Sequence, residues 1–347
     1  MTMVFYILLV LVGTALVWKG SELLEKASER IALYYELPDV VTGAVVVAVG
    51  SSFPELSTTV ISTLVHGEFE LGVSAIVGSA VFNILVIPGL SGVLGQTQLE
   101  ANRDLVYKEA QFYMLAVAML VITFAFAAIY HPTPDPQGGG AIVGTLTRPL
   151  AMIPIAMYLL YLFVQWQDTM EYEAEESGTG ISVVREWLRL GLSLLIILCG
   201  VEALVRAAIG FGEIFGTPSF LWGITVIAAA TSIPDAFVSV RAARRGNAVT
   251  SLANVLGSNI FDLLICIPLG VMIAGAAAIN FSLAVPMMGA LTLATLVLFL
   301  TMRTNMVLTV RESWFLLSLY VAFVTWISLE SLAIIDTVPH FPPPQTS

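Results

Sequence analysis

Long apolar stretches recur along the whole chain at nearly even spacing, separated by short polar segments. Most of them approach the ~20 residues that an α-helix needs to cross the hydrocarbon core of a membrane. None shows the alternating pattern of a membrane β-barrel strand. The pattern predicts an all-α integral membrane protein with ten transmembrane helices. We expect these helices near residues 3–18, 39–63, 71–95, 112–130, 149–165, 188–208, 219–240, 249–274, 284–302 and 313–335.

The composition supports a membrane protein. Hydrophobic residues make up 58% of the 347 residues, only 11% are charged, and the mean hydropathy is +0.91. Soluble proteins carry about 25% charged residues, so this chain has too few charges to cover a water-exposed surface. Cys199 and Cys266 both fall inside apolar stretches and indicate no disulfide framework. The first apolar stretch lacks a basic leader and a cleavage pattern, so we expect a retained span rather than a signal peptide.

Lysine and arginine are distributed unequally between the predicted loops. Of the 14 basic residues, twelve lie in or beside odd-numbered loops, and only Arg148 and Arg206 lie in even-numbered ones. The positive-inside rule then places the odd-numbered loops in the cytoplasm. We therefore predict a multi-pass protein of the cell (plasma) membrane with both termini extracellular. The net charge of −11 owes much to an acidic run between Asp168 and Glu176, which lacks EF-hand spacing and is typical of a solvated linker.

The chain contains two copies of one unit. Residues 41–56, V-T-G-A-V-V-V-A-V-G-S-S-F-P-E-L, match residues 221–236, L-W-G-I-T-V-I-A-A-A-T-S-I-P-D-A, at an offset of 180. Further on, G-S-A-V-F-N from Gly78 matches G-S-N-I-F-D from Gly257. Each copy holds five predicted spans, and an odd number inverts the second copy in the membrane. We predict a first five-helix repeat at 1–166, a short acidic cytoplasmic linker at 167–187, a second repeat at 188–337 and an extracellular tail at 338–347.

Each repeat places a proline beside an acid within an apolar stretch. Pro54 precedes Glu55, and Pro234 precedes Asp235. Proline lacks an N–H and displaces the carbonyl four residues earlier, so we expect both spans to break and free backbone oxygens beside the carboxylates. An acid at the centre of a membrane helix costs about 3 kcal/mol on insertion scales, and no lysine or arginine lies in the same span core as Glu55. Two matched acids therefore predict a shared hard-oxygen site for calcium or sodium.

Other polar residues recur at matched positions. Ser79 and Asn83 are four residues apart, as are Ser258 and Asp262, so each pair lies on one helix face. The symmetry of the two pairs and the acidity of Asp262 favour a place in the cation site over a role as packing contacts only. Glu22 also matches Glu202 at the offset of 180, but both lie near predicted span ends, where solvation is the expected role.

At these motifs the sequence resembles the cation/calcium exchanger superfamily. G-S-S-F-P-E-L with V-G-S-A-V-F-N-I-L, and A-T-S-I-P-D with G-S-N-I-F-D, are similar to its alpha repeats and are closest to those of the potassium-dependent sodium/calcium exchangers. The short linker looks like that of a microbial sodium/calcium exchanger. The chain departs from many microbial members in having Asp235 rather than a glutamate, and Ala80 stands in the first repeat where the second has Asn259.

The resemblance implies roles for individual residues. Glu55 and Asp235 would bind calcium together with the carbonyls of Ser51 and Thr231. Sodium sites would use Ser52, Ser79, Ser232 and Ser258, with the carbonyls of Ala48 and Ala228. Asn83 and Asp262 would complete the centre, and Asp262 falls where the potassium-dependent branch carries an acid linked to potassium.

The expected function is secondary active antiport of sodium for calcium by alternating access, with rocking of the first and sixth spans. The residues leave three alternatives open: additional transport of potassium, calcium/proton antiport, and a cation channel. No nucleophile–base set is present, so we do not expect an enzyme. The expected partners are calcium and sodium ions and the lipid bilayer, with no nucleic acid and no prosthetic group. Transported calcium, sodium and, as an open case, potassium are the only ions expected.

Overall fold

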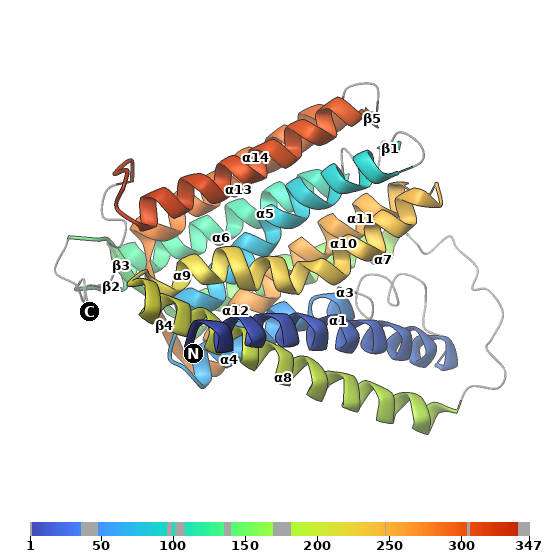
Figure 1. Cartoon of the computed structure of the whole chain (residues 1–347), viewed down its shortest axis with the longest axis horizontal. Helices are drawn as coiled ribbons and strands as arrows, with labels where there is room; N and C mark the ends of the chain where they lie inside the picture. Colours follow the sequence, from blue (N-terminus) through green and yellow to red (C-terminus); the bar gives the residue numbers. More distant parts are fainter. Residues whose placement is uncertain are drawn as a thin grey trace.

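The computed structural model describes residues 2–35, 48–95, 99–100, 108–134, 140–168, 182–246, 248–303 and 306–338. Across these residues the chain is almost entirely helical, and the long helices follow the long axis of the molecule (Figure 1). In the described part, nine helical segments are long and apolar enough to cross a membrane. The all-α class is confirmed. The nine segments are α1 (Thr2–Tyr34), α5 (Phe69–Leu94), α6 (Ala110–Tyr130), α7 (Arg148–Asp168), α8 (Val183–Phe215), α9 to α10 (Ser219–Arg244), α11 to α12 (Ala248–Ala274), α13 (Phe281–Arg303) and α14 (Val310–Ser331).

The predicted span at 39–63 lies only partly within the described residues. Its described portion forms α3 (Ala48–Ser51) and α4 (Phe53–Leu64), which are separated at Ser52. The total of ten membrane helices therefore stays a prediction. The two interrupted segments of the second half are continuous in direction but contain π-helical turns, η3 (Gly223–Ile227) before α10 (Ala228–Arg244) and η4 (Asp262–Cys266) before α12 (Ile267–Ala274).

Two helices are much longer than expected. The spans predicted at 3–18 and 188–208 belong to α1 and α8, each of 33 residues, or roughly 50 Å at 1.5 Å per residue. The predicted span at 3–18 covers only the first half of α1, which continues through a charged segment that begins at Lys19. Glu22 bonds both Lys19 (2.7 Å) and Lys26 (2.6 Å) at helical spacing, and such pairs let the helix continue through its charged segment.

α1 and α8 run antiparallel and pack against each other (Figure 1). Glycines allow this close approach: a Cβ on Gly13 would lie 2.8 Å from the carbonyl oxygen of Gly200, and one on Gly20 would lie 2.5 Å from Ile197 Cγ1. Gly20 and Gly200 also match each other between the two repeats, at the offset of 180. Their match therefore reflects a shared helix–helix contact, as small residues commonly provide in membranes.

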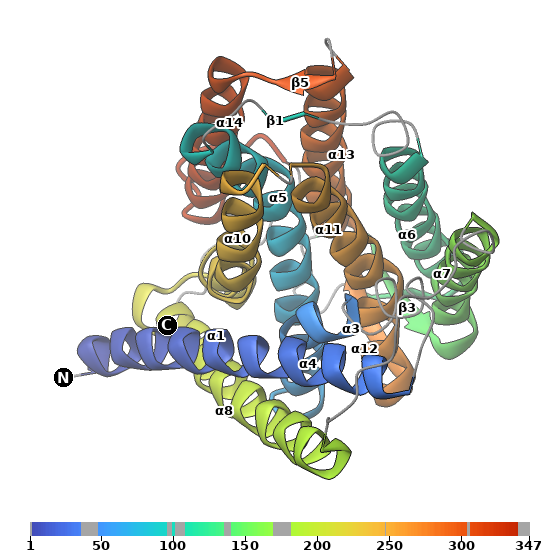
Figure 2. The ribbon, with the colours of Figure 1, turned by 90° about the vertical axis from the view of Figure 1, so that its right-hand side faces the viewer.

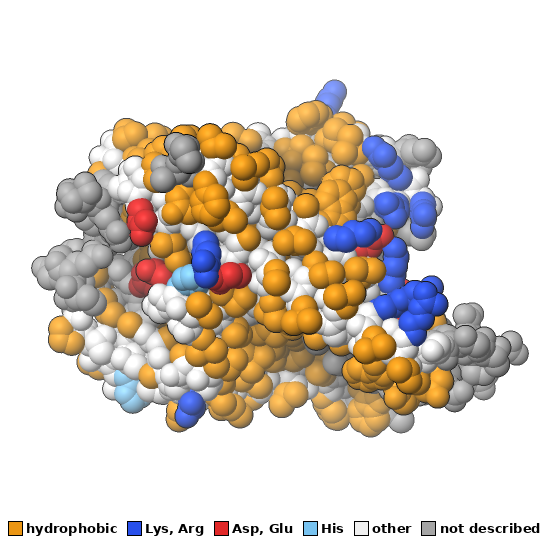
Figure 3. Space-filling model, turned by 60° about the horizontal axis from the view of Figure 1, so that its bottom comes forward, with side chains coloured by type: hydrophobic (Ala, Val, Ile, Leu, Met, Phe, Trp, Pro, Cys, Tyr) orange, Lys and Arg blue, Asp and Glu red, His pale blue; other side chains and the backbone are white. Residues whose placement is uncertain are grey.

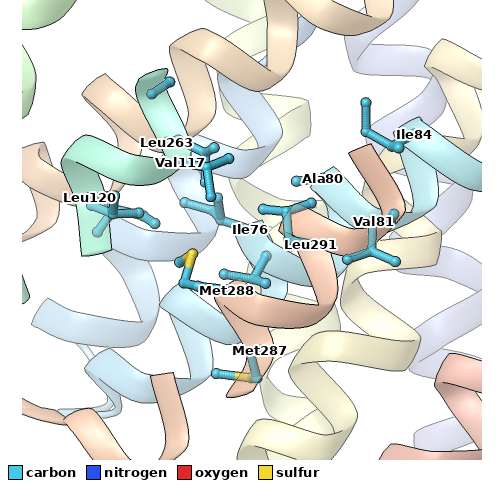
Figure 4. Packing of buried hydrophobic residues seen from close by; sticks show 14 of the residues in the cluster. Ile76, Ala80, Val81, Ile84, Val117, Leu120, Leu263, Met287, Met288 and Leu291 are labelled. Carbon is cyan, nitrogen blue, oxygen red and sulfur yellow. The ribbon is translucent and has the colours of Figure 1, made fainter. Parts of the chain in front are cut away.

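α5 is the central helix, surrounded by the others in the end-on view of Figure 2. In its most apolar 18-residue stretch, 94% of the residues are buried, which fits a helix that is hydrophobic on all sides. Figure 4 shows part of this packing. Side chains of α5 meet those of α6, η4 and α13 there: Ile76, Ala80, Val81 and Ile84 lie against Val117, Leu120, Leu263, Met287, Met288 and Leu291.

Gly78 offers a direct test of the packing between α5 and η3. A Cβ at Gly78 would lie 2.3 Å from the carbonyl oxygen of Ile224 and 2.7 Å from its Cα, so Gly78→Ala must push two backbones apart. We expect a loss of about 1–3 kcal/mol, as for other overpacked sites, seen as a lower Tm in detergent. Gly191→Ala is the control, because nothing lies within 4 Å of a Cβ there. Equal Tm values for the two variants would contradict this packing.

Two small sheets, which the sequence did not predict, lie near opposite ends of the helices (Figure 1). One consists of β2 (Pro132–Thr133), β3 (Val143–Thr147) and β4 (Ala276–Asn280), with β3 antiparallel to β4. The other pairs β1 (Leu99–Glu100) with β5 (Val307–Leu308). In each sheet a strand of the first half of the chain pairs with a strand of the second half, so the sheets join the two halves outside the helices.

The surface shows the charge asymmetry found in the sequence. Most of the Lys and Arg side chains visible in Figure 3 lie at its right-hand end, and hydrophobic side chains cover much of the remaining surface. α1 begins and α14 ends at the opposite end (Figure 1). Apolar side chains such as Leu188 and Ile129 are 70% and 66% exposed, as expected for a surface that faces lipid. Which end faces the cytoplasm stays a prediction.

Candidate cation site

The first proline–acid motif lies at an interruption between two helices. The chain leaves α3 at Ser51, turns at Ser52 and enters α4 at Phe53. Pro54 occupies the first turn of α4, where its missing N–H leaves no helical bond unmade. Glu55 follows in the same first turn, where the positive end of the helix dipole favours a carboxylate. The predicted break in this span is therefore confirmed.

The second motif lies within an unbroken helix. α10 runs through Pro234 without interruption, so the break predicted there was wrong. Pro234 withholds one N–H from the carbonyl of Ala230, and neighbouring helices in a membrane protein can hold such a helix straight. The irregular segment lies upstream instead, at the π-helical turn η3, and Ala228 begins α10 directly after it.

Glu55 is the centre of a buried polar contact between three helices. Its side chain lies in α4 and is 3% exposed. Glu55 Oε1 accepts a hydrogen bond from Ser79 Oγ of α5 (3.2 Å), and Ser79 Oγ shares a second bond with Ser232 Oγ of α10 (2.7 Å). Glu55 Oε2 is buried and has no hydrogen-bond partner among the described residues. Thr231 of α10 lies beside the same carboxylate. One oxygen of Glu55 is thus held by a serine hydroxyl, and the role of the carboxylate as an ion ligand stays a prediction.

Asp235 and Asp262 are the other buried acids. Asp235 of α10 is 8% exposed and Asp262 of η4 is 1% exposed, and both interact electrostatically with Glu55. No ion pair joins any of the three to a basic side chain within the described part of the chain. Three like charges in a low-dielectric interior repel one another, and a bound cation relieves that repulsion.

Neutral oxygens must supply part of any coordination shell. In the described ranges, no group of three or more His, Cys, Asp or Glu side chains converges closely enough to hold a metal ion unaided. Hydroxyl and carbonyl oxygens are ordinary ligands of calcium. The buried hydroxyl of Ser52 has no hydrogen-bond partner in the described structure, and the carbonyl of Ser52 lies 3.9 Å from Cys266 Sγ.

Asn83 is paired with Asn259, which the sequence analysis noted only because the first repeat has Ala80 at the matching position. Asn83 Nδ2 donates to Asn259 Oδ1 (2.9 Å), and Asn259 Nδ2 donates to the carbonyl of Ala80 (3.2 Å). The Asn259 side chain therefore joins α11 to α5 through both atoms of its amide. Asn83 Oδ1 is buried without a partner in the part of the chain that the structure describes.

The Asn83–Asn259 pair predicts a stability effect. Asn259→Leu would leave the buried amide of Asn83 without its acceptor and remove the bond to Ala80. We expect a loss of about 1–3 kcal/mol, the usual cost of a buried polar group left unsatisfied, measured as a lower Tm in detergent. Ser318→Ala is the control, since Ser318 is exposed and bonds only within α14 (2.7 Å). A Tm for Asn259→Leu as high as that of the control would contradict the assignment.

The remaining predicted residues lie on α3, α10 and α11. Ser258 Oγ donates to the carbonyl of Val255 on its own helix (3.2 Å). Thr231 Oγ1 donates to the carbonyls of Ile227 (3.1 Å) and Ala228 (3.3 Å). Ala48 begins α3 and Ser51 ends it. Their assignment as ligands stays a prediction.

The sequence analysis missed one cysteine and two tyrosines that lie near Asp262. Cys266 Sγ lies 3.7 Å from Asp262 Oδ1, and the four-residue spacing on one helix could have indicated this contact. Tyr113 of α6 and Tyr158 of α7 also lie near Asp262. Nothing in their apolar sequence context distinguishes these tyrosines from ordinary core residues, so only the tertiary structure could identify them.

The matched acids Glu22 and Glu202 are not at helix ends, which corrects the position expected for them, although both side chains are partly exposed. Glu22 lies within α1 and bonds two lysines. Glu202 lies within α8 and contacts His66 Nε2 (3.0 Å) and Arg206. The helices extend beyond the predicted spans, which places both acids one or more turns inside.

A cavity of ≈ 430 Å³ opens beside Asp235, between α1 and α10. Among the lining residues Asp235 is buried, Ser51 is partly exposed, and Lys19 and Arg241 are exposed. Lys19 and Arg241 belong to the basic residues of the odd-numbered loops, so the exposed part of the cavity lies on the cytoplasmic side in the predicted topology. The full lining is Ala15, Trp18, Lys19, Ser21, Glu22, Glu25, Ser51, Pro234, Asp235, Phe237, Val238 and Arg241.

Comparison with known families gives one match that spans almost the whole chain. The family model described as sodium/calcium exchanger protein matches residues 5–167 and 186–329. The interval between the two matched segments coincides with the acidic linker, and each segment contains one proline–acid motif. The resemblance drawn from the motifs is confirmed at the level of the family.

Individual relatives point the same way. The sodium/calcium exchanger MaX1 of Methanosarcina acetivorans is 25% identical over 348 aligned residues, covering 91% of this chain and 96% of the relative. The human sodium/potassium/calcium exchanger 4 is 39% identical over 100 residues, but these cover only 28% of this chain and 15% of the relative. The solved structure of the sodium-calcium exchanger NCX_Mj, soaked with 10 mM Na⁺ and zero Ca²⁺, superposes with a TM-score of 0.62 at 24% identity, covering 93% of this chain and 99% of that one. This last likeness concerns the fold.

Proposed function

We propose that this chain, which belongs to the sodium/calcium exchanger protein family, is a secondary active antiporter that exchanges sodium for calcium across the cell membrane by alternating access. The observation that carries this proposal is the group of three buried acids, Glu55, Asp235 and Asp262, without a basic partner in the described residues. Within a membrane such a group favours a cation that enters and leaves.

Occupancy of the site is exclusive in this proposal. Glu55 and Asp235 hold either one calcium ion or sodium ions, because their charge and the space beside them serve one cargo at a time. The carbonyls of Ser51 and Thr231 complete the calcium shell. Asn83 and Asp262 lie at the centre. Sodium is held by the same acids with the remaining predicted oxygens, those of Ser52, Ser79, Ser232, Ser258, Ala48 and Ala228.

The architecture that we propose is ten transmembrane helices in two inverted repeats, 1–166 and 188–337, with the 167–187 linker in the cytoplasm and the 338–347 tail outside. The Lys/Arg-rich end faces the cytoplasm in this arrangement. Movement of α1 and α8 against the other helices would open the site to either side. The close glycine contacts between these two long helices support their movement as a pair.

Potassium is a second candidate cargo. The support is Asp262, a third buried acid beside Glu55, together with the identity of 39% to part of an exchanger whose name includes potassium. In this version calcium moves together with potassium against sodium. Asp262 would then carry the charge that balances the additional ion.

Calcium uptake into proteoliposomes tests the proposal, with a sodium, proton or potassium gradient imposed singly and with none. We expect uptake driven by an outward sodium gradient, and the proton gradient alone should drive none. A requirement for potassium on the calcium side would identify the second cargo. Uptake driven by protons instead of sodium would indicate calcium/proton antiport. Calcium flux without any counter-ion gradient would indicate a channel and overturn the proposal.

A further inference from the structure

Glu25 is an acid in the cavity that the proposed exchange site does not use. It lies in α1, is half-buried, and lines the same cavity as Asp235 and Ser51. Its backbone adjoins α3, since a Cβ on Gly50 would lie 4.0 Å from Glu25 Cα. Glu25 also interacts electrostatically with Asp235. Glu25 therefore shares one cavity with the buried acid Asp235 and with the exposed basic side chains of Lys19 and Arg241.

Glu22 and Glu25 both lie on α1 and line the cavity, but only Glu22 forms ion pairs with described residues. Glu22, also on α1 and in the cavity, is neutralised by Lys19 (2.7 Å) and Lys26 (2.6 Å). Glu25 has no hydrogen bond or ion pair to any described residue, although Lys26 is adjacent in sequence. Its carboxylate is left available to the cavity. An acid placed this way attracts cations from solution and raises their local concentration.

Asp235 is the second acid of this cavity that lacks a recorded partner among the described residues. It is 8% exposed, lines the cavity, and makes no hydrogen bond or ion pair within the described residues. Two carboxylates without protein partners thus line one cavity at different depths, Asp235 buried and Glu25 nearer the surface. The basic residues at the surface end are partly neutralised, since Lys19 already bonds Glu22.

We propose that Glu25 is an access ligand for calcium, which holds the cation in the cavity between bulk solution and the central acids and so sets the affinity on this one side. This inference rests on the proposed function, because the cation is the cargo of the exchange site. The cavity lies between α1 and α10, where Trp18 and Phe237 also touch across it with ring centroids 4.3 Å apart. Movement of α1 would remove Glu25 from Asp235 and close the route. Glu25 therefore acts only when the site is open to the Lys/Arg-rich end.

The test compares Glu25→Gln with wild type in membrane vesicles of both orientations, with calcium varied on one face at a time. We expect the KM for calcium to rise about tenfold at the Lys/Arg-rich face, with kcat and the KM at the opposite face unchanged. The KM of wild type at that face should also rise with ionic strength, and that of Glu25→Gln should rise less, because screening removes the same attraction.

Glu29→Gln is the matched control, since Glu29 lies on the same helix, is exposed and does not line the cavity. It should leave the KM at both faces unchanged. An unchanged KM for Glu25→Gln, or equal losses at both faces, would overturn the proposal, and a Tm in detergent identifies a folding defect. The flux is driven by whichever gradient drives the wild type. A wild type that ignores sodium would refute the proposed exchange, whereas the comparison of faces would still decide the role of Glu25.

Discussion

Glu55→Gln is expected to abolish sodium-driven calcium transport, with a loss of at least ~100-fold, because even residues that only support a metal ligand cost 10–100-fold in affinity. The change removes the charge of a 3% exposed carboxylate and keeps its shape. The amide oxygen can still accept the bond from Ser79, so the contact between α4 and α5 survives. The measurement is calcium uptake into proteoliposomes under a sodium gradient, with protein amount matched between preparations.

Folding must be separated from ion binding in this variant. Removing one of three repelling acids should leave the Tm without ions equal to wild type or higher. Calcium should raise the Tm of wild type, because a ligand that binds only the folded state stabilises it, and should not raise that of Glu55→Gln. Glu213→Gln is the control, an exposed acid in α8. Wild-type transport in Glu55→Gln would show that this acid does not carry the ion.

Asp235→Asn is expected to show the second large effect, again a loss of at least ~100-fold in sodium-driven calcium uptake. Asp235 makes no hydrogen bond or ion pair to a described residue and faces the cavity, so its charge serves no structural contact there. Asp235→Glu retains the charge on a side chain one methylene longer, and the cavity beside this position can accommodate the longer side chain. It should keep transport with an altered KM for calcium.

The comparison of the two Asp235 variants separates charge from shape. Loss in Asp235→Asn with retention in Asp235→Glu indicates that a carboxylate is needed at this position. If both variants lost transport equally, the length of the side chain would matter as much as its charge. If both retained transport, Asp235 would not be part of the ion site. Calcium-induced shifts in Tm for both variants give a binding readout that does not depend on transport.

The sequence was most informative where a residue type has few alternative explanations. An acid beside a proline in an apolar stretch is costly in a membrane, so Glu55 and Asp235 could be identified without a structure. Their occurrence at an offset of 180 predicted one shared site, to which Ser79 and Ser232 were assigned from different repeats. The structure joins these serines by a hydrogen bond of 2.7 Å.

Other features depended on tertiary contacts that no local pattern contains. The apolar stretch at 3–18 covers only part of α1, because the helix continues through Lys19 and Glu22, which form an ion pair. Pro234 was expected to break a helix that its neighbours keep continuous. Asn259 acquires its role through hydrogen bonds with Asn83 and with the carbonyl of Ala80 on another helix. The contact of Asn259 joins segments distant in the sequence, whereas the Lys19–Glu22 pair lies on a single helix.

Exclusive occupancy of one site by calcium or sodium is the central claim, and calcium binding to the purified protein at increasing sodium concentration tests it most directly. If the two ions compete for Glu55 and Asp235, the calcium Kd should rise without limit as sodium increases. The rise should be steeper than proportional if more than one sodium ion replaces each calcium. A calcium Kd that is independent of sodium, or that levels off at high sodium, would mean that both ions can be bound together and would contradict the account.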